Sequence, residues 1–158
     1  MFAAIAGLLL QPVIGPVSEP TQAEVDALEV CIIEAGPDAA IRQCRGLVST
    51  ACMDQPGGET TAVQLACVRR ELAIWTHELE KAERDMTAAL ETAYTPSRPE
   101  AFQTAQEAWH DFMRAECRQQ SLLFEGGSFQ RVLVADCVMR LTAERAVELA
   151  AQLAEIEA

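Results

Sequence analysis

The sequence predicts an all-α protein, a disulfide-stapled antiparallel helical bundle with a three-helix core and a small N-terminal helical hairpin. Half of the 158 residues are apolar and few are aromatic, a composition that favours helices over a sheet. Apolar residues recur at spacings of three and four along most of the chain, and no long segment alternates with a period of two. Six cysteines lie in pairs around turn signals, so disulfides are expected to link the helices.

The first part of the chain is predicted to be a signal peptide. Phe2 to Leu10 form an uncharged apolar block, followed by a stretch that contains Pro, Gly and Ser. The block is too short to span a bilayer, and the remaining sequence offers no longer apolar segment. Leu-Glu-Val before Cys31 lacks the small residues of a lipoprotein processing site. We therefore expect an exported chain, periplasmic or secreted, without a membrane span.

The N-terminal hairpin is predicted from helix boundary signals. Thr21 and Glu24 have the spacing of a capping box, and residues with a helical apolar period follow them. Gly36 is expected to end this helix and Asp38 to cap the next one. Gly46 is expected to divide that second helix into two short pieces.

Three longer helices are predicted after a turn at 56–58. The first runs from Thr60 to about Tyr94 and stops at a Pro-containing segment, 95–99. The second runs from about Glu100 to Leu123, and the third begins at Ser128. The chain is thus divided into three parts: residues 1–23, a signal peptide; 24–56, the N-terminal hairpin; and 57–158, the main helical domain.

The apolar stripes of these helices predict their buried faces. Trp75 and Trp109 lie on such stripes, and packing in the core is the expected role of both. Arg145 lies among apolar residues of the last helix and is expected to pair with Glu116. The stripe of the second helix comprises Phe102, Ala105, Trp109, Phe112, Met113 and Cys117.

The cysteines predict structural disulfides. There is no C-x-x-C motif and there are only two histidines, so neither a zinc site nor a redox pair is expected. Residues equally far from the turn of an antiparallel hairpin face each other, which favours nearest-neighbour pairing. The main alternative joins Cys44 to Cys67 and Cys31 to Cys52. The favoured pairs are Cys31–Cys44, Cys52–Cys67 and Cys117–Cys137.

The charge of the chain restricts its partners. The net charge is −12 and the pI is about 4.5, which disfavours nucleic acid and anionic membranes. A basic protein partner would suit this charge, although an acidic surface also serves solubility alone. The sequence contains no nucleophile elbow, phosphate-binding loop or zinc-binding helix. No catalytic residue, metal or cofactor is therefore predicted.

One loop is a candidate for binding. Glu125, Gly126, Gly127 and Ser128 lie between the last two predicted helices, where glycine permits a positive φ and close approach of another backbone. A tight connection between two helices explains the same residues without any partner.

A pattern of residues in the last two predicted helices carries a family resemblance. Besides the Gly-Gly-Ser turn and the last two cysteines, it comprises Gln106, Trp109, Phe112, Glu116, Leu141, Thr142, Arg145 and Leu149. With these residues the chain resembles the lysozyme inhibitor LprI family of small exported bacterial domains, over about residues 44 to 153, and it departs from the family pattern at Met113, where an Arg is often found. The resemblance implies inhibition of lysozyme, and animal lysozymes are strongly basic, so an acidic inhibitor would be steered toward them. The alternative is a periplasmic structural or envelope-stress module with another partner.

Overall fold

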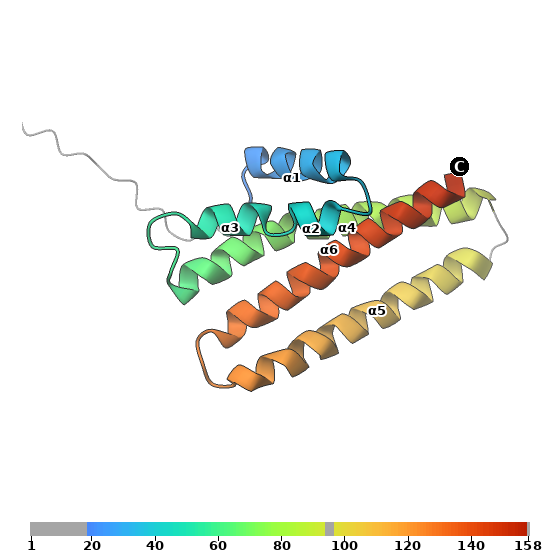
Figure 1. The fold of residues 1–158 in the computed structure, drawn as a ribbon. Helices are drawn as coiled ribbons and strands as arrows, with labels where there is room; N and C mark the ends of the chain where they lie inside the picture. The colour runs from blue at the N-terminus through green and yellow to red at the C-terminus, as the bar shows by residue number, and fades with distance from the viewer. Residues whose placement is uncertain (1–18, 94–96, 158) are drawn as a thin grey trace, which may run out of the picture.

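A computed structural model describes residues 19–93 and 97–157 of the chain (Figure 1). Within these residues every regular element is helical, which confirms the all-α class. The predicted signal peptide falls mostly outside the described residues, as do Tyr94 and the first part of the Pro-containing break. The helices are α1 (Gln22–Ala35), α2 (Ala40–Cys44), α3 (Leu47–Met53), α4 (Thr61–Ala93), α5 (Ser97–Ser121), the 3-10 helix η1 (Leu122–Phe124) and α6 (Gln130–Glu157).

The centre of the fold is the pair α4 and α6, which lie side by side over most of their lengths (Figure 1). Trp75 of α4 and Leu149 of α6 are fully buried between the helices, as is Leu28 of α1. One apolar cluster therefore joins the N-terminal hairpin to the long helices. Burial of each of the two leucines contributes about 1.5–3 kcal/mol to folding.

The boundaries of the first helices follow their capping signals with one exception. Thr21 and Glu24 form the predicted capping box, and Gly46 separates α2 from α3. The expectation that Asp38 caps α2 is wrong, because Ala39 occupies the N-cap and makes no side-chain cap. The backbone N–H groups of Ala39 and Ala40 both donate to the carbonyl of Gly36, so Asp38 lies inside a tight turn.

A buried carboxylate attaches the N-terminal hairpin to α4. Glu71 is fully buried, and its oxygens accept hydrogen bonds from the backbone N–H groups of Gly46, Val48 and Ser49 at 2.7, 3.1 and 2.8 Å. The Ser49 hydroxyl donates to it at 2.8 Å and the Trp75 indole N–H at 3.0 Å. Glu71 thus satisfies the free N–H groups at the start of α3 from a neighbouring helix. Sequence reasoning missed this residue.

Helix α5 is packed differently from its prediction. It contacts α6 more than α4, and none of its described residues belongs to the buried core cluster. Phe102 and Trp109 pack partly buried against that cluster, whereas Ala105 and Phe112 are exposed, the latter by 54%. The expectation that Ala105 and Phe112 join the core is wrong, because a helix with one main neighbour buries only a narrow stripe.

Three disulfides link the helices in the nearest-neighbour pattern. Their Cα–Cα distances lie within the range that disulfides require. They join Cys31 to Cys44 at 5.7 Å, Cys52 to Cys67 at 5.6 Å and Cys117 to Cys137 at 5.4 Å.

Replacing Glu71 by Ala is expected to lower the free energy of unfolding by roughly 3 kcal/mol or more, because buried N–H donors of Val48, Ser49 and Trp75 lose their acceptor. Glu80→Ala is the matched control, an exposed carboxylate on the same helix whose loss is expected to change stability by under about 0.5 kcal/mol. Urea unfolding of the oxidised proteins measures both values. Equal stability of the two variants would contradict the role given to Glu71.

Candidate functional site

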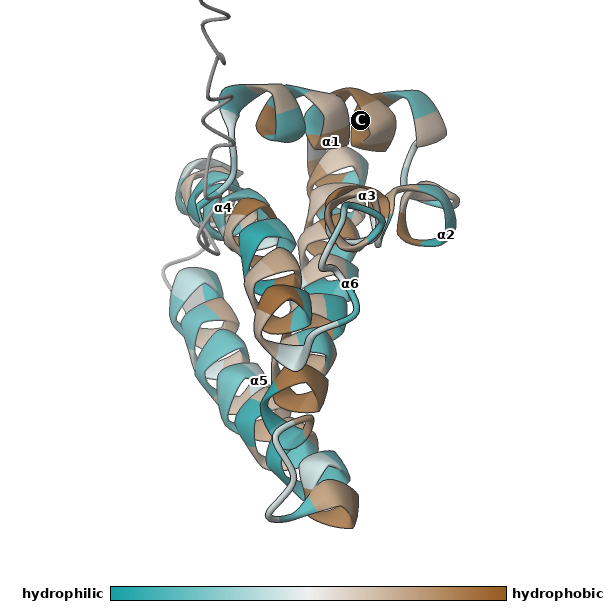
Figure 2. Ribbon diagram, turned by 90° about the vertical axis from the view of Figure 1, so that its left-hand side faces the viewer, coloured by the Kyte–Doolittle hydropathy of each residue, from teal (hydrophilic) through white to brown (hydrophobic). Residues whose placement is uncertain are grey.

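The turn between α5 and α6 carries an exposed apolar surface. Helix α5 is followed by η1, and α6 begins only at Gln130, so the expectation that Ser128 starts this helix is wrong. The N–H groups of Val132 and Leu133 donate to the carbonyl of Phe129, which places the helix start after Phe129. Figure 2 shows hydrophobic colouring where α5 ends at this turn. We call the four exposed residues here the apolar tip: Leu122, Leu123, Phe124 and Phe129.

The tip has a defined conformation. Gly126 has a φ of 80°, a left-handed conformation that favours glycine, and the Gly127 N–H donates to the Phe124 carbonyl at 3.1 Å. The rings of Phe124 and Phe129 meet edge to face across the turn, with centroids 6.3 Å apart. Leu123 is the most exposed of the four residues, with 83% of its surface accessible to solvent.

The candidate loop predicted from sequence, Glu125 to Ser128, lies at the centre of this tip and is exposed. The four apolar residues around it were not predicted as part of a site. The available signal was an apolar run, Leu122 to Phe124, that only Glu125 separates from a glycine pair, with Phe129 beyond Ser128 on the other side of the pair. Apolar residues at that place lie beyond the ends of the packed helices, where no neighbour covers them.

Buried groups behind the tip hold its two ends together. Cys117 and Cys137 are both buried, and their disulfide joins α5 to α6. The hydroxyl of Ser121, also buried, donates to the Arg118 carbonyl at 2.8 Å and accepts from the Gln130 amide at 3.4 Å. A surface closed in this way loses little conformational entropy on binding a partner.

Further along the hairpin, a polar cluster connects three helices. Arg145 of α6 donates to the side-chain oxygen of Gln106 on α5, and its guanidinium lies 5.9 Å from the Trp109 ring centroid. Gln106 is buried and donates in turn to Glu83 of α4 at 2.7 Å. Arg145 also forms an ion pair with Glu148 at 2.8 Å. The cluster therefore fixes how α5 lies against α4 and α6.

The predicted pairing of Arg145 with Glu116 is wrong. Arg145 lies eight residues after Cys137, and in an antiparallel hairpin it therefore faces a residue about eight before Cys117, which is Trp109. Glu116 instead accepts a hydrogen bond from Gln120 of its own helix at 2.6 Å.

The other residues of the resemblance are distributed over the hairpin. Thr142 and Leu149 are buried and Leu141 is half-buried, whereas Phe112 is exposed on α5. The structure thus brings Gln106, Trp109 and Arg145 together, and Phe112 and Glu116 lie outside that cluster.

Residues 19–93 and 97–157 contain neither a metal-binding cluster nor a helix that could span a membrane. No group of three or more His, Cys, Asp or Glu side chains there is placed to hold a metal ion. None of the helices in this part of the chain has the length and apolarity needed to cross a membrane.

Arg145→Ala is expected to lower the free energy of unfolding by about 2 kcal/mol, because the buried Gln106 loses its donor and Trp109 loses a cation–π contact. Arg140→Ala removes an Arg of the same helix that pairs with Glu144, and it is expected to cost about 0.5 kcal/mol or less. Thermal and urea unfolding measure both. An Arg145 variant as stable as the Arg140 variant would show that the polar cluster does not hold α5.

Comparison with known proteins identifies the family. The model of the family described as lysozyme inhibitor LprI matches residues 52–149, which include the apolar tip and the polar cluster. A Rhodobacter capsulatus protein, described as an uncharacterized 17.7 kDa protein in the puhA 5' region, is 28% identical over 131 residues, covering 77% of this chain and 81% of that protein. No solved structure matches the chain significantly. Since the family match covers more than half of the 158 residues, the chain belongs to the lysozyme inhibitor LprI family.

Proposed function

We propose that this chain is an exported, non-enzymatic binding protein that inhibits a lysozyme-type muramidase through its apolar tip. The observation that carries the proposal is the tip itself. Large apolar side chains are exposed at the end of a hairpin that a buried disulfide closes. Exposed apolar groups in a fixed arrangement are typical of protein–protein contact surfaces.

The family supports lysozyme as the partner class, and the charge of the chain fits it. A net charge of −12 attracts a basic protein and raises the rate of encounter. The apolar tip then supplies the desolvated contact that charge alone does not provide. Glu125, at the turn itself, adds a carboxylate beside the apolar residues.

Export is part of the proposal. All six cysteines form disulfides, and such bonds persist in oxidising compartments such as the periplasm or the extracellular space. Mass spectrometry of the native protein is expected to find no free thiol.

Leu123→Ser is expected to weaken inhibition of lysozyme about tenfold or more, because burial of a leucine in an interface contributes about 1.5–3 kcal/mol. Folding is expected to be unchanged, since Leu123 is 83% exposed. The assay is lysis of bacterial cell walls by lysozyme at increasing concentrations of the oxidised protein.

Ile33→Ser is the matched control, because Ile33 is 79% exposed on α1, far from the tip (Figure 1). This variant is expected to inhibit as the unmodified protein does. Equal inhibition by Leu123→Ser and Ile33→Ser would show that the apolar tip is not the surface that binds lysozyme. If the unmodified protein, at micromolar excess, inhibits none of several classes of lysozyme, a muramidase is excluded as the partner and another envelope partner is favoured.

A further inference from the structure

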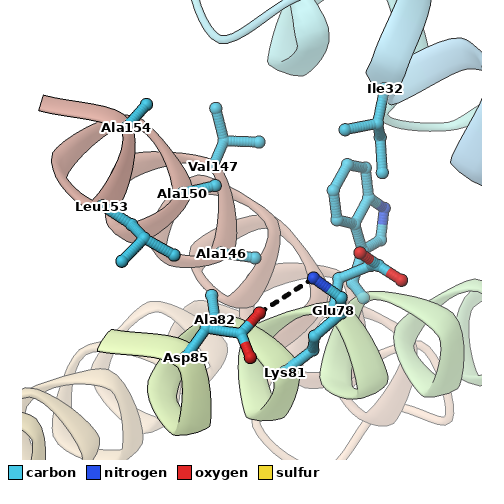
Figure 3. Close-up of a pocket in the computed structure, with 11 residues that line it drawn as sticks. Ile32, Glu78, Lys81, Ala82, Asp85, Ala146, Val147, Ala150, Leu153 and Ala154 are labelled. Carbon is cyan, nitrogen blue, oxygen red and sulfur yellow. Dashed lines mark hydrogen bonds and ion pairs between the residues drawn. The ribbon is translucent and has the colours of Figure 1, made fainter. Parts of the chain in front are cut away.

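A separate pocket lies between Ile32, near the end of α1, and the helices α4 and α6 (Figure 3). Its volume is about 170 Å³. The indole of Trp75 and the side chain of Ile32 line it, and alanines of α6, among them Ala146 and Ala150, form a wall of small apolar groups. Neither the apolar tip nor the polar cluster contributes a residue to it.

The charged groups at the pocket are unevenly paired. Lys81 and Asp85 form an ion pair at 2.9 Å and neutralise each other (Figure 3). Glu78 is half-buried beside them, and no described residue forms a hydrogen bond or ion pair with its carboxylate. The wall from α6 adds no charge. At the edge of an apolar pocket, the Glu78 carboxylate therefore has no hydrogen-bond or ion-pair partner among the described residues.

The surroundings of Glu78 raise its pKa above the usual value of a glutamate. Burial is the main cause, and the negative charge of Glu29 on α1 adds to it. His77 and Lys81 on α4 act in the opposite direction without cancelling these effects. A cation placed beside Glu78 would relieve both the burial of an unpaired charge and its repulsion by Glu29.

We propose that this pocket binds an alkylammonium group, a positively charged amine on a short apolar stem. The stem would lie against Ile32 and the exposed alanines of α6, above the buried Trp75, and the amine would pair with Glu78. The size agrees, because a cavity of about 150 Å³ is known to hold benzene, and a five-carbon amine has a similar number of heavy atoms. The site does not depend on lysozyme as the partner of the tip.

Other ligand classes fit the pocket less well. An anion would meet Glu78 and Glu29, and a neutral apolar molecule would leave Glu78 unpaired. Typical cofactor and drug sites enclose roughly 300–1,000 Å³, so this pocket suits a single side chain or small amine.

The test is binding of n-pentylamine to the oxidised protein, followed by NMR of the alanine methyl groups and by titration calorimetry. Shifts are expected at Ala146 and Ala150. The amine is expected to bind about tenfold more tightly than n-pentanol, and pentanoate is expected not to bind, as a charge-assisted hydrogen bond to Glu78 implies. Equal affinity for the alcohol and the amine, or shifts elsewhere only, would overturn the proposal.

Two variants separate this site from general effects of charge. Glu78→Gln is expected to weaken amine binding about tenfold, whereas Glu80→Gln removes the same charge from an exposed position of α4 and is expected to leave binding unchanged. Ala150→Leu, at an exposed position of α6, is expected to fill the pocket and abolish binding without unfolding the protein. If Glu78→Gln and Glu80→Gln weaken amine binding equally, the effect is one of overall charge and the proposed site is contradicted.

The source of the amine can be determined in the same experiment. Binding of Nα-acetyl-lysine methylamide at least as tightly as n-pentylamine would assign the pocket to a lysine side chain of a protein. Binding of the free amine alone would assign it to a small molecule.

Discussion

The placement of α5 against α6 is the constraint on which the candidate binding surface depends. Apart from Cys117 of the disulfide, no described apolar residue of α5 is fully buried. The helix is held instead by the Cys117–Cys137 disulfide at one end and by the contacts of Arg145 with Gln106 and Trp109 further along. The apolar tip can be presented to solvent in a fixed form because these groups, and not its own burial, hold its two ends.

The N-terminal hairpin is attached by a comparable device. Glu71 accepts hydrogen bonds from the start of α3 and from Trp75, so one carboxylate positions α3 on α4. The apolar pair α4 and α6 thus forms the centre, and buried polar groups and disulfides determine where the smaller elements lie on it. Removing one partner of such a buried polar contact leaves the other unsatisfied, and these contacts therefore specify a single arrangement.

Much of this fold was predictable because its signals are local. Helical periodicity gave the class and the number of long helices, and the turn between each cysteine pair favoured the observed disulfides. The expected cap at Asp38 and the expected helix start at Ser128 are wrong, since hydrogen bonds within the adjacent turns, not residue type, decide where α2 and α6 begin. The predicted partner of Arg145, Glu116, is wrong because the sequence of each helix alone does not determine how far α5 and α6 are shifted along each other. The sequence contains one signal that could have predicted the burial of Glu71. This charged residue lies three after Val68 and four before Trp75, on an apolar stripe.

Hydrogen exchange of the complex with lysozyme tests the central claim, that the apolar tip is the surface that meets the muramidase. Amide exchange is measured by mass spectrometry for the oxidised protein alone and with a saturating excess of lysozyme. The account predicts that lysozyme slows exchange mainly in residues 118–131, which contain the tip and its flanking turns. Slowed exchange confined to α1 or to the exposed face of α4, with residues 118–131 unchanged, would contradict it.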